Sequence, residues 1–270
     1  MPLPAVGYQN IPVAGNNGVT WAVLTLQQMG KTLEKQTLAS FQLPVHTEDQ
    51  GFMSADSIVL EVYDETGTMT GNYAFVDNYT KGNFGLTNPG WYPWQKVSDW
   101  EVNDADIANN VEVPFGHGVV ITSGEDDCDM TFAGQVLGEK TYTVFGNNGV
   151  TWIGNATPVD LKLGDLALPA HTENEGFMSA DSIVLEIYDE TGTMTGNYAF
   201  VDNYTIGNFG LTNPGWYPWQ KVSDWEVTDN DLQNDIVNIP SGKMVIITSG
   251  EADTTLTLPD PMKVTPPTAE

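Results

Sequence analysis

The chain has 270 residues, with 36 acidic and nine basic side chains, and its net charge at pH 7 is -27. A surface of this sign repels phosphate backbones and anionic lipid headgroups, so we expect no nucleic-acid partner and no membrane insertion. Cys128 is the only cysteine, which excludes an intramolecular disulfide. The N-terminus shows no signal-peptide pattern, which indicates a mature secreted product or a protein not exported by that route, such as a viral one.

Short β-strands are predicted along most of the chain. Residues 56–79 alternate apolar and polar side chains around "DETG", which predicts a hairpin. Residues 118–124, 129–136, 140–145 and 150–155 are rich in β-branched and aromatic side chains, which favours further strands. Helical character is confined to 26–41, which we interpret as a helix or an elaborated hairpin, and to one acidic turn within 98–110.

An internal repeat organises this pattern. "GNNGVTW" begins at Gly15 and again at Gly146, and the segments 51–102 and 176–227 differ only at Val62/Ile187 and Lys81/Ile206. We therefore predict an all-β protein of two tandem modules, 1–136 and 137–270, the second ending in a Pro-rich tail. Each module has the size of one β-sandwich, of jelly-roll or immunoglobulin-like type.

The order of motifs in the second module runs from "GNATPVDLKLGDL" through "ADSIVLEIYDETG" and "GWYPWQ" to "IPSGKMVIITSG". It resembles a repeat of surface and secreted proteins of Verrucomicrobia, Lentisphaerae and related bacteria. The resemblance covers nearly all of the second module and the later two thirds of the first. It implies a small β-module at the cell surface or outside the cell and carries no enzymatic activity with it.

An aromatic stretch, "NPGWYPWQKVSDWEV", occurs twice without change, at 88–102 and 213–227. Exposed rings there would stack on sugars or form contacts between subunits, whereas buried rings would belong to the core of a sandwich. Pro89 and Pro93 fix the chain in extended or turn geometry, so alternate rings leave it on different sides, and we expect at least one tryptophan to be core. The candidate residues are Trp91, Tyr92, Trp94, Trp100, Trp216, Tyr217, Trp219 and Trp225.

Two acidic loops, "NDAD" and "TDND", occupy corresponding positions and offer the hard oxygen ligands that calcium takes. The candidate Ca²⁺ ligands are Asp104, Asp106, Asp229 and Asp231, with solvated turns as the alternative. His46 and His171 also correspond, but no second histidine or cysteine cluster accompanies them, so we interpret them as structural or solvated.

Chemistry needed by both modules should be present in both. Cys128 corresponds to Thr254 and His117 to Lys243, and no nucleophile or nucleotide motif is present. We therefore expect no enzymatic activity and, apart from calcium, no cofactor. The favoured hypothesis is a structural protein that associates with copies of itself in an extracellular or cell-surface assembly, such as a filament or surface layer, or in a virion. The alternative is a glycan-binding adhesion module that uses the duplicated aromatic loops.

Overall fold

The structure is a computed structural model of the whole chain. It describes residues 6–26, 35–41, 43, 58–75, 94–96, 108–114, 116–124, 126–166, 168, 183–200, 219–221, 237–250 and 252–264. The described secondary structure consists of β-strands and two short 3-10 helices, and no α-helix occurs in these ranges. The predicted all-β class is confirmed.

The chain forms two compact units. The first comprises Met1–Asp64, Thr68–Val136 and Glu190–Gly192, and the second comprises Glu65–Gly67, Leu137–Asp189 and Thr193–Glu270.

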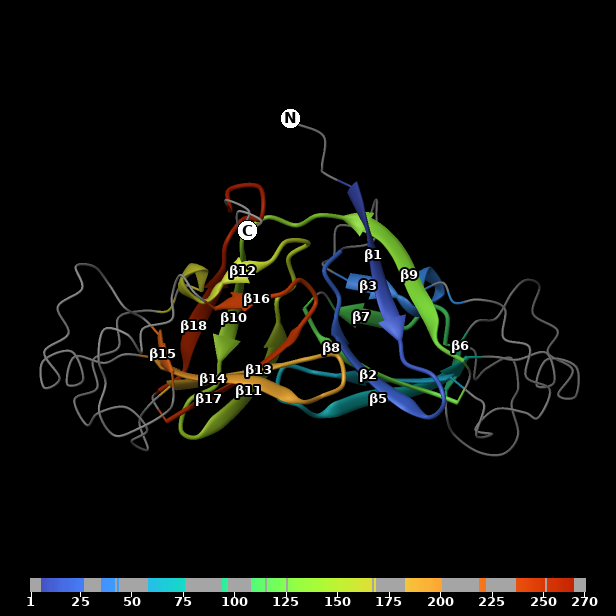
Figure 1. The fold of residues 1–270 in the computed structure, drawn as a ribbon, viewed down its shortest axis with the longest axis horizontal. Coiled ribbons are helices and arrows are strands. Elements are labelled where there is room, and N and C mark those ends of the chain that lie inside the picture. Colours follow the sequence, from blue (N-terminus) through green and yellow to red (C-terminus); the bar gives the residue numbers. More distant parts are fainter. Residues whose placement is uncertain are drawn as a thin grey trace, which may run out of the picture. The chain divides into compact units, whose positions relative to one another are not determined.

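The first unit contains nine described strands, shown in blue to green in Figure 1. They are β1 (Val6–Val13), β2 (Gly18–Val23), β3 (Lys35–Thr37), β4 (Ile58–Tyr63), β5 (Met69–Phe75), β6 (Trp94–Lys96), β7 (Glu112–Pro114), β8 (Gly118–Ser123) and β9 (Cys128–Gln135). Within the predicted helix or hairpin at 26–41, the structure shows strand β3 followed by the 3-10 helix η1 (Leu38–Ser40).

The strands of the first unit pair in a nested order. The first strand pairs with the last, β1 with β9, then β2 with β8 and β3 with β7, around the central hairpin β4–β5. Every pairing is antiparallel, and β2-β8-β4-β5-β6 form one five-stranded sheet. In the described residues the four nested pairs belong to three sheets, which are β1-β9, β3-β7 and the five-stranded sheet. Nested antiparallel pairing of this kind is the strand order of a jelly roll. Of the two predicted sandwich types, the first unit therefore has the jelly-roll type.

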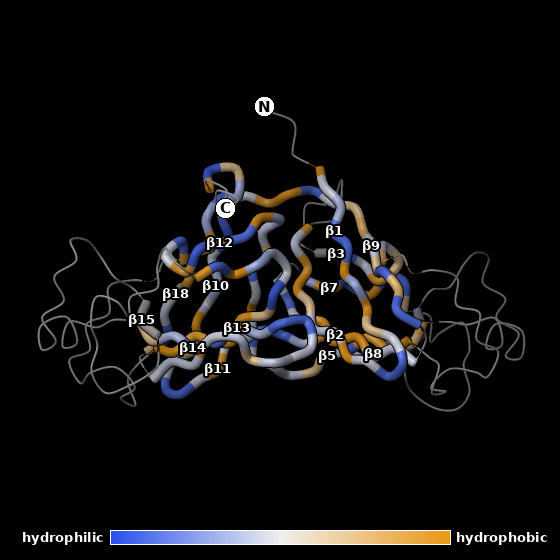
Figure 2. The backbone as a smooth tube through the Cα atoms, in the orientation of Figure 1, coloured by the Kyte–Doolittle hydropathy of each residue, from blue (hydrophilic) through white to orange (hydrophobic). Residues whose placement is uncertain are grey.

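The core of the first unit lies between these sheets. Alternate residues of β4 are buried, and β1 and β9 likewise bury one side of the ribbon that they form. Hydrophobic residues, orange in Figure 2, are interspersed with hydrophilic ones along the strands. One buried cluster joins side chains from all of the sheets, and Phe41 and Phe132 meet in it with ring centroids 5.4 Å apart. The cluster includes Ile11, Val13, Leu38, Ile58, Leu60, Phe75, Trp94, Val113, Val119, Ile121, Met130 and Phe132.

The second unit also contains nine described strands, yellow-green to red in Figure 1. They are β10 (Lys140–Val144), β11 (Gly149–Gly154), β12 (Leu161–Lys162), β13 (Ile183–Tyr188), β14 (Met194–Phe200), β15 (Trp219–Lys221), β16 (Asn238–Ile239), β17 (Met244–Ser249) and β18 (Thr254–Leu258). The 3-10 helix η3 (Leu163–Asp165) follows β12.

The pairing of the second unit is nested in the same way. Strand β10 pairs with β18, β11 with β17 and β12 with β16 around the hairpin β13–β14, and β11-β17-β13-β14-β15 form its five-stranded sheet. Side chains from both sides of this sandwich, including Ile153, Ile239, Val245 and Leu256, surround a cavity of only about 10 Å³. This cavity has room for at most about one water molecule.

The turn between the first two strands of each unit is set by asparagine. In "GNNG", Asn16 and Asn17 have φ of 54° and 63°, and Gly18 N donates to Gly15 O at 2.8 Å. Positive φ at both central residues defines a type I′ turn, whose twist matches that of antiparallel strands, and asparagine tolerates it better than most residues. Asn147 and Asn148 repeat this geometry, with φ of 55° and 64°. Both turns therefore reverse the chain between strands of different sheets, β1 and β2 in the first unit and β10 and β11 in the second.

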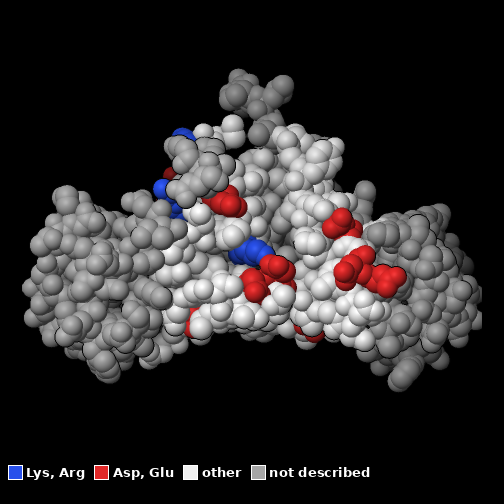
Figure 3. Space-filling view, viewed as in Figure 1, with Lys and Arg blue, Asp and Glu red and all other residues white. Residues whose placement is uncertain are grey.

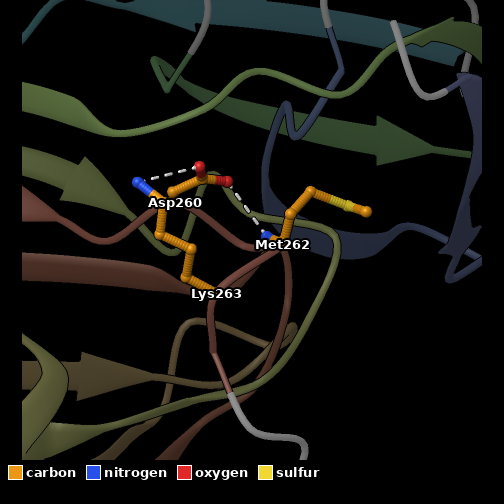
Figure 4. Close-up of polar contacts among 3 residues, drawn as sticks. All are labelled: Asp260, Met262 and Lys263. Carbon is orange, nitrogen blue, oxygen red and sulfur yellow. Dashed lines mark hydrogen bonds and ion pairs between the residues drawn. The ribbon is translucent and has the colours of Figure 1, made fainter. Parts of the chain in front are cut away.

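The described part of the second unit ends in a polar turn after β18. Asp260 Oδ1 accepts from Met262 N at 3.0 Å, and Lys263 Nζ lies 3.4 Å from Asp260 Oδ2 (Figure 4). The Met262 side chain is 75% exposed. An exposed ion pair of this kind contributes little to stability. The turn is therefore defined by the bond to Met262 N and by the backbone bond from Lys263 N to Asp260 O at 2.8 Å.

Candidate functional site

The aromatic candidates lie largely outside the described residues. Trp91, Tyr92, Trp100, Trp216, Tyr217 and Trp225 belong to that group. Trp219 is described in its backbone only, as the first residue of β15, where it pairs with Phe200. Trp94 is described in full and is 0% exposed. Trp94 is thus a core residue, as the sequence predicted for at least one tryptophan of these stretches.

Trp94 is held at the end of the five-stranded sheet of the first unit. It lies opposite Phe75 in the β5–β6 register, and its carbonyl accepts from Ala108 N at 3.0 Å. The backbone N–H of Trp94 donates to Asn109 Oδ1 at 3.4 Å. Since its ring is completely covered, Trp94 offers no face to a sugar or a second subunit. Any contact role of the repeated aromatic stretch falls to its other rings.

The calcium candidates Asp104, Asp106, Asp229 and Asp231 also lie outside the described residues. Within the described ranges, no group of three or more His, Cys, Asp or Glu side chains is arranged to hold a metal ion.

One duplicated acidic residue that is described has a structural role. Asp127 Oδ1 accepts from Gly15 N at 2.8 Å, and Asp253 Oδ1 accepts from Gly146 N at the same distance. Each bond ties the loop before the last strand of a unit to the turn after its first strand. These carboxylates hold turns together in the same way in both units.

A tyrosine–glutamate pair recurs on the outer face of each five-stranded sheet. Tyr63 Oη donates to Glu61 Oε2 at 2.8 Å, and Tyr188 Oη donates to Glu186 Oε2 at 2.8 Å. Burial, with a smaller effect of the hydrogen bond and charge of the glutamate, raises the pKa of Tyr63 from 10.0 to about 12. The pKa of Tyr188 is raised to about 12 by the same causes. Both phenols therefore remain neutral hydrogen-bond donors at physiological pH.

The ends of the two sandwiches are closed differently. Leu24 is fully buried in the first unit, and the corresponding residue of the second is Asn155, 1% exposed. Asn155 Nδ2 donates to the carbonyls of Val159 and Ile239 at 2.9 and 2.8 Å, while its Oδ1 accepts from the Thr157 N–H and hydroxyl at 3.0 and 2.6 Å. All four bonds stay within the second unit, so this amide is a structural group.

An exposed apolar surface that we did not single out in the sequence lies on β1. The side chains of this strand alternate between exposed and covered, and its outward positions include Val6, 56% exposed, and Tyr8, 86% exposed. Tyr8 is the most exposed large hydrophobic side chain among the described residues. The period-two spacing of Val6 and Tyr8 was a usable signal, because Ile11 and Val13 lie in the opposite phase and are buried.

Charged groups are distributed unevenly over the described surface. In the view of Figure 3, acidic side chains form small groups separated by uncharged surface. Strand β1, with the sequence VGYQNIPV, contains no charged residue. In a chain with a net charge of -27, an uncharged strand is a place where a second acidic molecule can approach closely.

The fold defines the class of the protein: an all-β chain with jelly-roll pairing in each of its two units. No protein-family model matches the chain, and the comparison with curated proteins finds no match. Among solved structures, the chain is similar to the crystal structure of the major capsid protein P2 from bacteriophage PM2. The identity is 11%, the match covers 93% of this chain and 95% of that chain, and the TM-score is 0.20. These values are too low to transfer a function.

No described helix is long and apolar enough to cross a membrane.

Proposed function

We propose that this protein is a non-catalytic structural subunit that associates with copies of itself to form the shell of a viral particle. The observation that carries the proposal is the nested antiparallel pairing of strands in both units. Jelly rolls of this topology are used in viral capsids and in lectins. A surface layer at the outside of a cell, the setting implied by the resemblance to bacterial surface repeats, would use the same self-association.

The packing of the described residues is that of a rigid unit, which is suited to a subunit of an assembly. In each unit the sheets enclose a buried core, and the nested pairing joins strands far apart in sequence, β1 with β9 and β10 with β18. Such long-range pairing makes a unit rigid, because no strand can leave without exposing both its edge and its buried side chains. A rigid subunit loses little conformational entropy when it associates, which favours assembly through modest contacts.

The net charge of -27 predicts how assembly depends on salt. Like-charged subunits repel over about 30 Å at 0.01 M salt and over about 3 Å at 1 M. We expect monomers at low salt and large assemblies as salt rises. Sedimentation velocity across this range, with electron microscopy of the high-salt sample, tests the proposal. A monomer at all salt and protein concentrations would contradict it.

The same preparations test the glycan-binding alternative. If the protein stays monomeric but binds a polysaccharide, and if the double variant Trp91→Ala, Trp216→Ala loses that binding while remaining folded, the adhesion module replaces the structural subunit. A shell subunit should instead assemble less well in this variant, if those rings form contacts. Hydrolase activity abolished by one Asp or Glu substitution would contradict the non-catalytic part of the proposal.

A further inference from the structure

We propose that strand β1 is a self-association edge, at which the outward face around Tyr8 and the free backbone edge of β1 meet the same strand of a second copy of the chain. This inference rests on the proposed function, since it names the surface through which two subunits would bind. The observations that carry it are the exposure of Val6 and Tyr8, the absence of charge on β1, and a contrast between the two units.

The first step concerns the backbone. Within the part of the chain that the structure describes, β1 pairs with β9 and with no other strand, so one of its edges is unpaired. An unpaired edge presents N–H and C=O groups at the spacing that another strand needs. Pro12 lacks an N–H and blocks one end of β1, which leaves the segment 6–11 for pairing. Two copies of one strand can pair antiparallel about a two-fold axis.

The second step is the contrast with the corresponding strand of the second unit. Strand β10 has five residues where β1 has eight, and it begins with Lys140, whose Nζ lies 5.7 Å from the centroid of the Tyr142 ring. The residue that corresponds to Tyr8 is the exposed Glu139. Short length and charged side chains are the features by which proteins protect an edge from pairing. One chain therefore carries the same edge twice, with charged residues at Glu139 and Lys140 where β10 begins and with none on β1.

The third step identifies the occupant by charge. A basic partner would be attracted to the acidic surface as a whole and would gain nothing from an uncharged strand. A second copy, with the same charge of -27, is repelled by that surface and approaches most easily where charge is absent. On the neighbouring strand β9, the residues opposite Val6, Tyr8 and Asn10 are also uncharged: Gln135, Ala133 and Thr131. The uncharged outward face thus extends from β1 onto β9 over these three pairs and ends at the exposed Asp129, opposite Pro12.

Tyr8 is suited to the centre of such a contact. Its ring is 86% exposed, so it has almost its whole area to bury in an interface. Tyrosine adds a large rigid surface and a hydroxyl at little cost in side-chain entropy, and buried tyrosines are among the residues that dominate interface energies.

The test introduces into β1 the charge that the second unit carries. In Tyr8→Glu, we expect the dissociation constant for self-association, measured by sedimentation at high salt, to rise at least about tenfold. Tyr8→Phe should associate like the wild type. Met194→Glu adds the same charge at a side chain that is 47% exposed in the second unit, and it should associate nearly as the wild type does. Circular dichroism melting checks that each variant is folded.

Hydrogen exchange of the wild type provides a readout that needs no variant. On association, amides of the segment 6–11 should gain protection, whereas those of β10 should not. The inference is wrong if β1 gains no protection, if Tyr8→Glu associates as the wild type does, or if Met194→Glu weakens association equally. If the wild type assembles but these results contradict the role of β1 in self-association, the proposed function stands and the contact surface lies elsewhere. A wild type that never associates contradicts both.

Discussion

The ring of Trp94 meets the ring of Phe75 edge to face, with centroids 5.5 Å apart and an interplanar angle of 71°. Both side chains are fully buried, and they join β5 to β6 on the inner side of the five-stranded sheet. Edge-to-face aromatic pairs contribute beyond the area that they bury. Trp94, from the repeated aromatic stretch that the sequence offered as a contact surface, is therefore part of the core.

Replacing Trp94 by alanine should destabilise the protein by about 3–5 kcal/mol, because it removes the largest fully buried side chain described and leaves a cavity. Chemical denaturation measures the loss, and Trp94→Phe, which keeps an aromatic partner for Phe75, should lose less. If Trp94→Ala were as stable as the wild type, the assignment of this ring to the core would be wrong.

The stability of the second unit should depend on Asn155, which corresponds to Leu24 of the first unit. Asn155→Leu introduces the residue that the first unit has at the same place, Leu24, and removes the acceptor of two bonds from Thr157 and the donor of two others. Leaving buried backbone groups without partners costs about 1–3 kcal/mol each, so we expect a loss of at least about 2 kcal/mol in unfolding free energy. The reciprocal Leu24→Asn should also destabilise. Stability unchanged in Asn155→Leu would show that the amide network contributes nothing.

The tyrosine–glutamate pairs predict a dependence on alkaline pH. The pKa of Tyr63 is raised from 10.0 to about 12, so its unfolded form releases a proton at lower pH than its folded form does. The contribution of this phenol to stability is therefore present in full below pH 10 and is lost as pH rises to about 12. An ultraviolet absorbance titration of the native protein should show phenols that ionise at about pH 12 instead of pH 10.

Glu61→Gln provides the matched change. It should lower the pKa of Tyr63 while leaving it above 10.0, because burial, the largest cause, remains. The same change at Glu186 should do likewise for Tyr188, and the double variant should shift two phenols. A titration curve identical to that of the wild type would rule out a role for the glutamates.

The Asp127 carboxylate, which accepts from Gly15 N, should make a modest contribution to the free energy of unfolding. Asp127→Ala removes the acceptor of a 2.8 Å bond, and we expect a loss of about 0.5–1.5 kcal/mol in thermal or chemical unfolding. Asp127→Asn keeps an oxygen in reach and should lose less. Asp253→Ala, which removes the corresponding bond to Gly146 N, is the second-unit control and should behave similarly.

Calcium binding by the acidic loops stays a prediction from the sequence. If Asp104, Asp106, Asp229 and Asp231 bind Ca²⁺, the melting temperature should rise with added calcium and fall with a chelator, because a ligand that binds only the native state stabilises it. The variant Asp104→Asn, Asp229→Asn should lose the response. If the melting temperature changes neither with calcium nor with a chelator, the calcium hypothesis is wrong.

The sequence by itself determined the class of the fold and the positions of its clearest hairpins. Alternating residues at 56–79 predicted β4 and β5, because a strand with one buried face must alternate, and the structure has both strands there. The structure adds a tight turn at "GNNG", where asparagine adopts positive φ; in the sequence these letters marked only the internal repeat. The absence of charge on β1 was also present in the sequence, as was the glutamate that replaces Tyr8 in the second copy.

Only the tertiary structure decided between a jelly-roll and an immunoglobulin-like sandwich, because that choice depends on which distant strands pair, such as β1 with β9. It also decided that Trp94 is core and Tyr8 is exposed. Both are aromatic residues in short extended segments. Alternation along β1 was a local signal for Tyr8, but no local pattern identified which tryptophan of the repeated stretch is buried. The difference arises because Trp94 lies in one buried cluster with side chains from distant strands, such as Met130 and Phe132, whereas the outward face of β1 has no described strand against it. Burial is a property of the packed layers, and a single segment does not contain it.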